Sequence, residues 1–328
     1  MITVYRRENG RIVEQRLDLS EPVPPDTIWI DLLNPAMEEQ RQVSEQVGAE
    51  LPTFEEMVEI QLSARLYEED GVIYMNASSL ANAETEAPER GPVSYVLTPK
   101  YLITQRFIEP RFVQLYVTRC LRQPSLMDSP EEALIGLLES VVERGADVLE
   151  FVGNRLDELS HRIFDDGTGG TRMLLSDPEK LRLLLRDVGQ NGALVGKMRD
   201  SLSNYQRLAP FLRTAADSRL GKELRPRLKT VERDVDSLSF QSDFLAQRVS
   251  FLLDATLGLV NLQQNNIVRI FSVAAVAFLP PTLIASIYGM NFEFMPELKW
   301  PLGYPMALLL MVLSAIVPLG YFKRRGWL

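Results

Sequence analysis

Polar or small side chains recur every three, four or seven residues near the C-terminal end of this 328-residue chain. The positions are Asp254, Gly258, Asn261, Asn265, Ser272, Leu279, Thr282 and Ser286. Their spacing has a period near 3.5, so on a helix they form one stripe, which is polar or small at every position except Leu279. Polar side chains in an apolar helix tend to face a bundle interior or a water-filled path. The stripe therefore favours a role in moving water or ions.

The same stripe also has a purely structural interpretation, because glycine, serine and threonine allow helices to pack closely. Its continuation through Asn265 and Asn261 to Asp254 favours the face of a pore. One helix cannot enclose a pore, whereas several identical chains around an axis could, each contributing this face. Pro280 and Pro281 are expected to kink the helix and free backbone carbonyls, either toward the pore or for packing alone.

Two long uncharged runs must position these residues. The first covers residues 270–292 and the second covers residues 300–322. A bilayer core needs about 20 apolar residues in a helix, so we expect transmembrane helices at 270–289 and 303–322. Residues 290–302 are then an extracytoplasmic loop. A pair of buried core helices is the alternative.

The charges that flank the two runs predict their orientation. Arg269 precedes the first run, and a basic tail, 323–328, follows the second. The hairpin between them carries only Glu293, Glu297 and Lys299. By the positive-inside rule, both termini are cytoplasmic and the hairpin faces out.

The residues before the spans are predicted to form an α+β cytoplasmic domain, 1–128, a helical region, 129–225, and a stalk helix, 226–269. Short β-rich runs predict a mixed sheet with helices. Strands are expected at 2–7, 27–32, 71–80, 93–98 and 101–107, and helices at 35–48 and 53–60. Further helices are expected from Ser129 and from Asp177 to about Tyr205. The stalk helix should continue into the membrane.

Composition excludes several classes of function. The net charge of −9 disfavours a nucleic-acid partner. A single cysteine, Cys120, and a single histidine, His161, permit neither an internal disulfide nor a Cys/His zinc cluster. The sequence has no P-loop, G-x-S-x-G or H-E-x-x-H motif, so we do not expect an enzyme. A membrane-tethered enzyme or scaffold remains an alternative.

The stretch Tyr288-Gly289-Met290-Asn291, at the end of the first span, resembles the Gly-Met-Asn motif of CorA-type magnesium (and cobalt) transport proteins. The similarity extends over FLPPTLIASIYGMNFEFMPELKWPLGYP and the basic end YFKRRGWL. The resemblance implies a homopentameric funnel, in which the first spans line the pore and the second spans form an outer ring. It places Gly289, Met290 and Asn291 at the outer mouth, where they make the first selectivity contact.

The resemblance also implies which residues line the pore. They are Asn265, Phe271, Leu279, Thr282 and Ser286. Four of these five lie on the stripe that the spacing alone indicates; Phe271 does not. Asp254, Asn261 and Ser272 are added from the stripe itself. Apolar rings of Phe271 and Leu279 could stop ions by dewetting, and we expect them to constrict the closed state.

Magnesium suits a mouth built of carboxamides. Mg²⁺ dehydrates reluctantly, so a ring of Asn291 side chains could hydrogen-bond its intact water shell. Carboxylates in that ring would hold the ion more tightly, which opposes the rapid release that conduction requires. Glu293 and Glu297 could instead attract cations from a distance, unless they are ordinary solvated loop charges. Met290 is expected to pack, because a thioether is a poor ligand for a hard ion.

The resulting prediction is a magnesium-uptake channel of the bacterial inner membrane, with cobalt and nickel as secondary ions. The resemblance implies gating by cytoplasmic Mg²⁺ bound at subunit interfaces, so Mg²⁺ is both transported and regulatory. Asp234, Glu84 and Glu86 are candidate regulatory ligands, although each could be an ordinary surface acid. The alternative function is a proton-coupled zinc transporter of the same fold.

Overall fold

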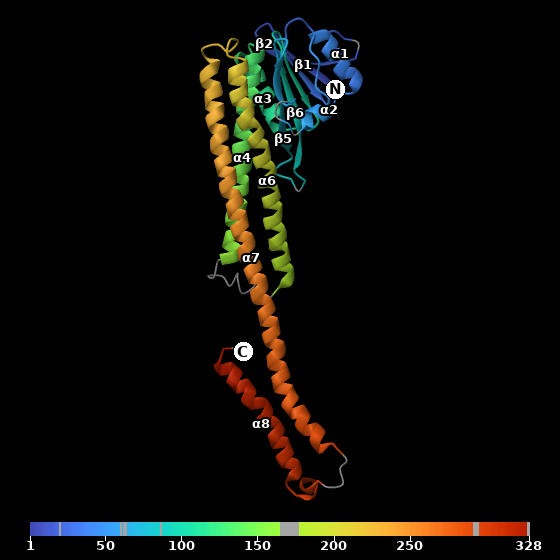
Figure 1. The fold of residues 1–328 in the computed structure, drawn as a ribbon, viewed down its shortest axis with the longest axis vertical. Coiled ribbons are helices and arrows are strands. Elements are labelled where there is room, and N and C mark those ends of the chain that lie inside the picture. The colour runs from blue at the N-terminus through green and yellow to red at the C-terminus, as the bar shows by residue number, and fades with distance from the viewer. Residues whose placement is uncertain are drawn as a thin grey trace. The chain divides into compact units, whose positions relative to one another are not determined.

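The chain divides into two compact units, one formed by residues 1–162 and 184–253 and the other by residues 163–183 and 254–328. The computed structural model describes residues 1–19, 21–59, 61, 64–85, 87–164, 177–290 and 295–326. Figure 1 shows the ribbon, with the element labels that follow.

The first unit contains a seven-stranded sheet in the order β2-β1-β3-β7-β6-β5-β4. The strands are β1 (Ile2–Glu8), β2 (Arg11–Leu17), β3 (Thr27–Leu33), β4 (Leu66–Glu69), β5 (Val72–Ala81), β6 (Glu89–Leu97) and β7 (Leu102–Arg106). Only β3 and β7 pair in parallel, and the other neighbours are antiparallel. The predicted mixed sheet with helices is confirmed. Strands β2 and β4 were not among the strands expected from the sequence.

Both missed strands belong to tight hairpins. The turn between β1 and β2 is Asn9-Gly10, with φ of 50° and 75°. The turn between β4 and β5 is Asp70-Gly71, with φ of 50° and 77°. Positive φ at two successive residues favours Asn or Asp followed by glycine, and this turn matches the twist of the strands it joins.

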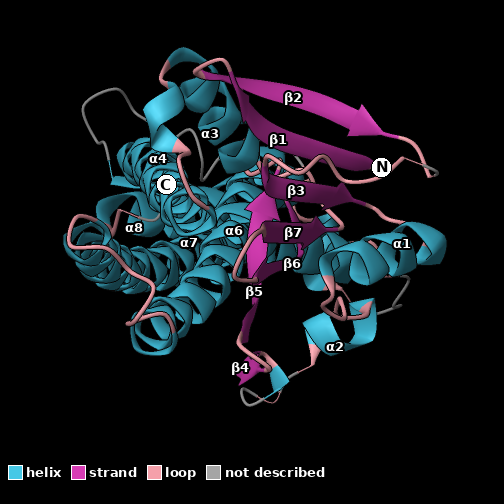
Figure 2. Cartoon of the chain, turned by 90° about the horizontal axis from the view of Figure 1, so that it is seen from above, coloured by secondary structure: helices cyan, strands magenta, loops and turns pink. Residues whose placement is uncertain are grey.

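Two short helices, α1 (Met37–Val47) and α2 (Phe54–Val58), lie on one side of the sheet (Figure 2). The buried cluster on this side includes Val43 of α1 and apolar side chains from six strands. Gly48 ends α1 with φ of 70°, a left-handed conformation that glycine adopts without cost. Thr53 begins α2 by accepting the backbone N–H of Glu56, whose carboxylate accepts the backbone N–H of Thr53.

Longer helices cover the other side of the sheet in this unit (Figure 2). They include α3 (Arg111–Arg122), α4 (Pro130–Phe164), α6 (Pro178–Ala215) and the first part of α7 (Leu224–Tyr288). On this side Trp29 stacks on Tyr5 with ring centroids 4.3 Å apart, and it contacts Tyr116 of α3 at 5.9 Å. All three rings are buried and join β1 and β3 to α3.

A buried ion pair lies among these aromatic rings. The Asp31 carboxylate of β3 lies 2.9 Å from the Arg106 guanidinium of β7. The same carboxylate accepts the hydroxyl of Thr104 at 2.6 Å, and that hydroxyl accepts the Trp29 indole N–H at 2.8 Å. Asp31 is 2% exposed, so this pair stabilises the parallel β3–β7 contact from inside the unit.

Capping residues begin two of the long helices. The Ser129 hydroxyl accepts the backbone N–H of Glu132 at the start of α4, and Asp177 does the same for Glu179 at the start of α6. The expected end of α6 near Tyr205 is wrong, because the helix continues past Pro210 to Ala215. Burial of Leu208 and Leu212 offsets the hydrogen bond that Pro210 removes.

Glycines allow α4, α6 and the first part of α7 to approach closely. A Cβ on Gly145 of α4 would lie 2.8 Å from Met198 of α6 and 3.2 Å from Leu238 of α7. A Cβ on Gly192 of α6 would lie 2.9 Å from Val249 of α7. These positions have no room for a larger side chain unless a neighbour moves.

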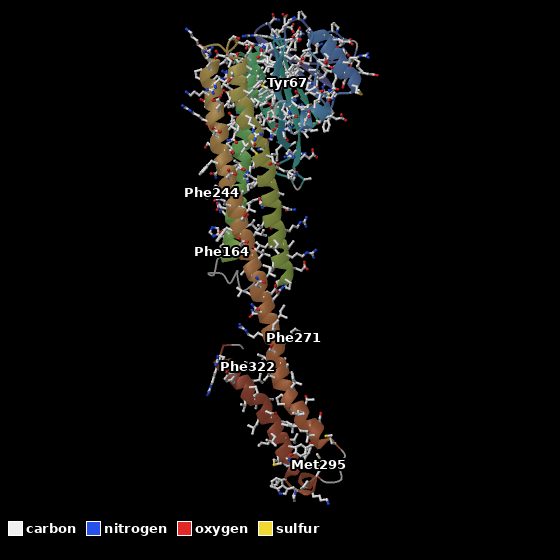
Figure 3. The ribbon with its side chains drawn as sticks, viewed as in Figure 1. Tyr67, Phe164, Phe244, Phe271, Met295 and Phe322 are labelled. Carbon is white, nitrogen blue, oxygen red and sulfur yellow. The ribbon has the colours of Figure 1, made fainter. Side chains whose placement is uncertain are left out.

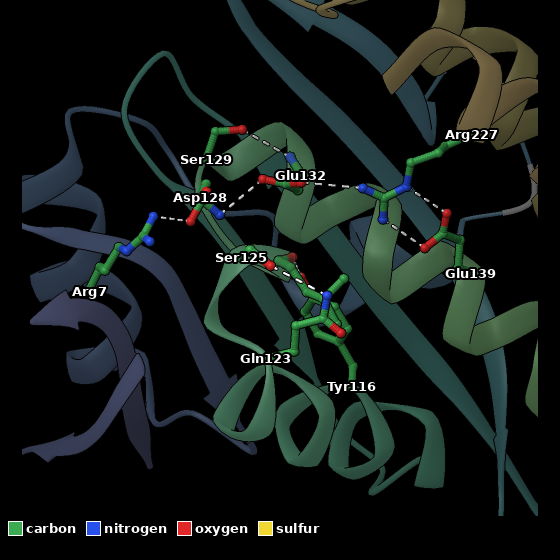
Figure 4. A network of polar contacts seen from close by, with 10 residues as sticks. Arg7, Tyr116, Gln123, Ser125, Asp128, Ser129, Glu132, Glu139 and Arg227 are labelled. Carbon is green, nitrogen blue, oxygen red and sulfur yellow. Dashed lines mark hydrogen bonds and ion pairs between the residues drawn. The ribbon is translucent and has the colours of Figure 1, made fainter. Parts of the chain in front are cut away.

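A chain of polar contacts joins the sheet to the starts of α4 and α7 (Figure 4). Arg7 of β1 pairs with Asp128, whose backbone N–H donates to the Glu132 carboxylate at 3.1 Å. Arg227 of α7 then lies 3.4 Å from Glu132 and 2.8 Å from Glu139. The hydrogen bonds that Arg227 donates to the Glu139 carboxylate raise the pKa of Arg227. The network therefore fixes the first turn of α7 against α4.

The second unit contains the last part of α7 and α8 (Gly303–Arg324), joined by a segment that includes η3 (Pro296–Lys299). Both helices contain stretches long and apolar enough to cross a membrane. The predicted long helix and two apolar C-terminal helices are thus confirmed. Large apolar side chains are exposed on both helices, including Phe278 at 72% and Val317 at 65%.

Candidate functional site

The stripe of polar or small residues lies on α7, and every one of its residues is exposed in the single chain. These are Asp254, Gly258, Asn261, Asn265, Ser272, Leu279, Thr282 and Ser286. The helix is continuous from Leu224 to Tyr288, so the predicted periodicity applies over the whole stripe. Nothing in the described part of the chain covers this face.

The buried residues of α7 lie roughly opposite the stripe. In the first unit they are Leu228, Val231, Val235, Ser242, Leu245 and Leu252, and in the second they are Thr256, Leu259, Val273 and Ala277. They too recur at intervals of three, four or seven residues, with one interval of fourteen, but at about 100° per residue they fall on the other side of the helix. One face of α7 therefore packs within its own chain, and the stripe is left for another partner.

Two hydroxyls on the stripe bond to the helix backbone. Ser272 donates to the carbonyl of Val268 at 2.8 Å, and Thr282 donates to the carbonyl of Phe278 at 2.7 Å. A hydroxyl that donates its proton in this way retains acceptor capacity on its oxygen. Both residues therefore present an acceptor suited to water around a cation.

Two large apolar side chains interrupt the polar surface. Phe271 is 71% exposed and Leu279 is 65% exposed. Leu279 is on the stripe, whereas Phe271 precedes Ser272 by one residue and so lies about 100° away around the helix. Figure 3 labels Phe271 on α7. Facing copies of these side chains could form apolar constrictions.

Pro280 and Pro281 lie within α7 without ending it. Neither has an N–H, so the carbonyls of Val276 and Ala277 lack their usual partners four residues on. Ala277 is 8% exposed and lies away from the stripe, whereas Val276 is 39% exposed. The two freed carbonyls thus originate on different sides of the helix.

The motif begins at the last turn of α7. Gly289 donates its N–H to the carbonyl of Ala285 at 2.9 Å, and a Cβ at Gly289 would lie 3.1 Å from that oxygen. A tight approach, rather than a left-handed φ, therefore favours glycine here. Met290 is 48% exposed. Asn291 and Glu293 lie outside the described residues, as does the side chain of Glu297.

A cavity of about 360 Å³ lies next to the motif within the second unit. Its lining comes from the end of α7 and the start of α8, and includes Tyr288, Gly289, Trp300, Tyr304 and Ala307. The aromatic side chains are of the kind that concentrate at membrane interfaces. The cavity therefore lies where the apolar stretches of both helices end.

The candidate regulatory acids differ in their surroundings. Glu84 lies 2.9 Å from Arg144 and 3.2 Å from Arg111, and its hydrogen bond from Arg144 lowers its pKa. Asp234 of α7 is exposed, and its carboxylate makes no ion pair among the described residues. Glu86 lies outside those residues. Among the residues that the structure describes, no three acidic, histidine or cysteine side chains are grouped to hold a metal ion.

Comparison with known proteins decides the family. The model of the CorA-like Mg²⁺ transporter proteins matches residues 25–324. The chain belongs to the CorA family. The resemblance inferred from the Gly-Met-Asn motif is confirmed. The magnesium transport protein CorA of Escherichia coli K12 is 35% identical over 330 residues, with 100% of both chains covered.

Solved structures agree with this CorA fold. The CorA magnesium transporter of Methanocaldococcus jannaschii is similar with a TM-score of 0.72 over 100% of this chain and 99% of that one, at 19% identity. The cytoplasmic domain of ZntB from Vibrio parahaemolyticus has a TM-score of 0.52, at 11% identity, over 79% of this chain and 97% of that one. At these identities the likeness concerns the fold alone.

Proposed function

We propose that several copies of this CorA-family chain form a channel for magnesium uptake, with α7 lining the path and α8 outside it. The observation that carries the proposal is the uncovered polar stripe of α7 within a helix that can span a membrane. Lipid is a poor neighbour for the hydroxyl groups of Ser272, Thr282 and Ser286 in the proposed span, which supports coverage of this face by other copies. The name of the Escherichia coli relative supports magnesium as the transported ion.

Five copies, as the family resemblance implies, would complete a homopentameric funnel in the bacterial inner membrane. Arg269 before the first span and the basic tail after the second would hold both termini in the cytoplasm. Residues 290–302 would then form the outer mouth. This arrangement places Asp254 toward the cytoplasmic end of the path.

The ion would cross the membrane with much of its water shell. Gly289, Met290 and Asn291 form the proposed mouth, where Asn291 bonds the hydrated ion, and Glu293 and Glu297 attract cations. The polar positions on the path are Asp254, Asn261, Asn265, Ser272, Thr282 and Ser286. All of these except Asp254 offer neutral oxygens, which bind weakly enough for release, and Phe271 and Leu279 interrupt the water column in the closed state.

Cytoplasmic Mg²⁺ would regulate the channel by binding between subunits. Bound metal would neutralise facing carboxylates, and its loss would let them repel and loosen the assembly. Asp234 suits this role better than Glu84, because the Glu84 carboxylate already pairs with two arginines. Glu86 remains a third candidate. Cobalt and nickel would pass as secondary ions.

A proton-coupled zinc transporter is the alternative, since the fold also resembles the ZntB cytoplasmic domain. Zinc sites in proteins use thiolate and imidazole ligands in addition to carboxylates. This chain has one histidine and one cysteine, and the cysteine is buried. Amide and hydroxyl oxygens along α7 are better matched to a hard ion such as Mg²⁺.

Ion flux into liposomes tests the proposal. The purified chain should admit Mg²⁺, read by an internal Mg²⁺-sensitive dye, with or without a pH gradient. Asn291→Ala should reduce this flux at equal protein incorporation, whereas Asn266→Ala, an exposed asparagine off the stripe, should not. Zinc flux that needs a proton gradient, without magnesium flux, would establish the alternative.

A further inference from the structure

Three buried polar side chains lie in a row across the sheet of the first unit. Asn76 of β5 is opposite Ser94 of β6, and Ser94 is opposite Gln105 of β7. Their exposed fractions are 3%, 0% and 0%. Directly opposite residues on neighbouring strands have Cβ atoms about 4.5–5.5 Å apart, so the three side chains lie beside one another on one face of the sheet. We call Asn76, Ser94 and Gln105 the polar row.

The polar row has hydrogen-bonding capacity that the chain leaves unused. Among the described residues, no partner bonds the Oδ1 and Nδ2 atoms of Asn76, the Oγ atom of Ser94 or the Oε1 atom of Gln105. The amide nitrogen of Gln105 is bonded, since it donates to the carbonyl of Pro52 at 3.1 Å. Buried polar groups are nearly always hydrogen-bonded in folded proteins, so the row has the properties of a surface that a bound molecule completes.

A cavity of about 160 Å³ lies two residues farther along the same strands. Its lining includes Ser78, which is two residues from Asn76 on β5, and Pro92, which is two residues from Ser94 on β6. Alternate residues of a strand point to the same face, so this lining continues the face of the polar row about 7 Å away. The cavity and the polar row are therefore neighbours.

Met57 of α2 separates the cavity from the polar row. Met57 lines the cavity and is 2% exposed, and its Sδ atom accepts the amide N–H of Gln105 at 3.5 Å. The methionine side chain therefore contacts both places. It is unbranched and rotates about three bonds, so it can move aside without a change in the backbone. Such a rotation connects the cavity to the polar row.

Positive charge gathers at the cavity. Arg65 and Arg90 line it, and the described lining residues include no carboxylate. The Nη1 atom of Arg65 donates to the Oδ1 atom of Asn204 at 2.7 Å, which positions this guanidinium, and the Nη1 atom of Arg90 lies 2.6 Å from Asp200. Burial and the charges of Arg90 and Arg207 lower the pKa of Arg65. Guanidinium groups bind phosphate and carboxylate through their fixed set of N–H donors, so an anion suits this cavity.

We propose that the cavity and the polar row bind a small anion that also carries hydroxyl groups, such as a phosphorylated or carboxylated polyol. Its anionic group bonds Arg65 and Arg90. Its hydroxyl groups displace Met57 and pair with Asn76 and Ser94, which offer both donors and acceptors. A volume of about 160 Å³ is below the range of drug-sized ligand pockets, so the molecule has only a few carbon atoms.

This site is separate in sequence from the residues proposed to conduct ions. None of its residues belongs to the stripe or to the Gly-Met-Asn motif. The proposal therefore does not depend on the proposed function, and binding can be measured without ion flux.

Binding of two probes to the purified full chain tests the site. Isothermal titration calorimetry of the detergent-solubilised chain, at fixed free Mg²⁺, should show binding of glycerol 3-phosphate or of glycerate. Ethyl phosphate and propionate carry the same anionic groups without the hydroxyls, and they should bind about tenfold more weakly. Failure of both hydroxylated anions to bind would overturn the proposal. Equal affinity for each hydroxylated anion and its matched control would also overturn it.

Arg90→Gln tests the charged end of the site. This variant should weaken binding of the hydroxylated anions about tenfold, because one guanidinium contact is lost. Arg199→Gln is the matched control and should bind as wild type does. Arg199 also pairs with an aspartate, Asp243, at 3.0 Å, but it does not line the cavity. Equal weakening by both variants would show a general effect of charge and would overturn the site.

Ser94→Ala tests the polar row, because it removes only a hydroxyl that has no partner among the described residues. This variant should lose most of the preference for glycerol 3-phosphate over ethyl phosphate. Ser140→Ala is the matched control and should keep that preference. Ser140 is also 0% exposed, but its hydroxyl donates to the carbonyl of Gly136 at 3.0 Å.

An unchanged preference in Ser94→Ala would reject the polar row as the place where the hydroxyls bind. Far-UV circular dichroism identifies a variant that fails to fold. The comparison of probes on the unmodified chain keeps the proposal testable in that case.

Discussion

The two units of this chain differ in how much of their side-chain surface is buried within the chain. In the first unit even a charged pair, Asp31 and Arg106, is buried and bonded within the chain. In the second unit Phe271 and Leu279 are more than half exposed on a helix with few internal contacts. The first unit buries most of its large apolar side chains within the chain, whereas the second leaves many of them uncovered. The contacts that stabilise the first unit are thus visible in one chain.

The largest expected effect is the loss of unfolding free energy when the buried ion pair of the first unit is broken. Asp31→Ala leaves the Arg106 guanidinium charged and without its carboxylate, which should cost about 3 kcal/mol or more of unfolding free energy. Urea denaturation followed by tryptophan fluorescence measures this loss. Arg7→Ala is the control, because its partner Asp128 is 43% exposed and the loss should stay within about 1 kcal/mol. Equal losses would show that burial does not distinguish the pairs.

A smaller effect should follow from filling a tight contact in the same unit. A Cβ at Gly136 would lie 2.3 Å from the ring of Tyr116, which is 2% exposed. Gly136→Ala should therefore destabilise the unit by about 1–3 kcal/mol. Gly189→Ala on α6, where no atom lies within 4 Å, should instead stabilise it by about 0.5–1 kcal/mol. The same urea titration measures both, and a loss at both positions would contradict the packing explanation.

In the second unit, removing an apolar side chain should open the path rather than unfold the chain. Leu279→Gly should raise resting Mg²⁺ flux about tenfold, the change expected if the barrier falls by about 1.4 kcal/mol. Leu309→Gly is the control, because Leu309 is 60% exposed on α8 and outside the proposed path. Unchanged Mg²⁺ flux through Leu279→Gly at equal incorporation would show that Leu279 does not form the constriction that closes the path.

Two adjacent asparagines test which face of α7 the ion meets. Both Asn265 and Asn266 are exposed, but only Asn265 lies on the stripe. Asn265→Ala should lower Mg²⁺ flux severalfold, because one ring of water-binding amides is lost, whereas Asn266→Ala should leave it near wild type. Dye-loaded liposomes measure both variants. A larger loss at Asn266 would place the path on another face.

The smallest expected effect concerns Cys120 in the first unit. Burial raises the pKa of its thiol to about 11, so the folded protein should resist alkylation at pH 8. Between pH 9 and 11 the unfolded chain loses this proton while the folded chain keeps it, so unfolding free energy should fall as pH rises. Mass spectrometry after iodoacetamide, with and without urea, measures the protection. Fast labelling of the folded protein would contradict burial.

Much of the local structure was predictable because short-range patterns determine it. Apolar alternation identified β1, β3, β5, β6 and β7, and the uncharged runs identified both apolar helices. The Asn9-Gly10 and Asp70-Gly71 turns also carried a recognisable hairpin signal, so β2 and β4 were predictable but missed. The parallel pairing of β3 with β7 could not be predicted from local sequence, because it joins strands about seventy residues apart.

The candidate site divides in the same way. The stripe followed from its spacing alone, since a helix converts intervals of three and four into one face. Opposite faces for the stripe and for the buried side of α7 became visible only with burial in the structure. The arginine partners of Glu84 were not predictable, because Arg111 and Arg144 approach it from separate helices.

The opposed faces of α7 also restrict how its length can change in evolution. Insertion of a single residue between Phe251 and Asn261 would rotate everything beyond it by about 100°, turning the hydroxyl groups of Ser272, Thr282 and Ser286 toward a different side of the span. Insertions or deletions of seven residues return both the stripe and the buried face of α7 to their original sides of the helix. Changes of three or four residues nearly do so. Lengths of this helix among related proteins should therefore differ in steps, not continuously.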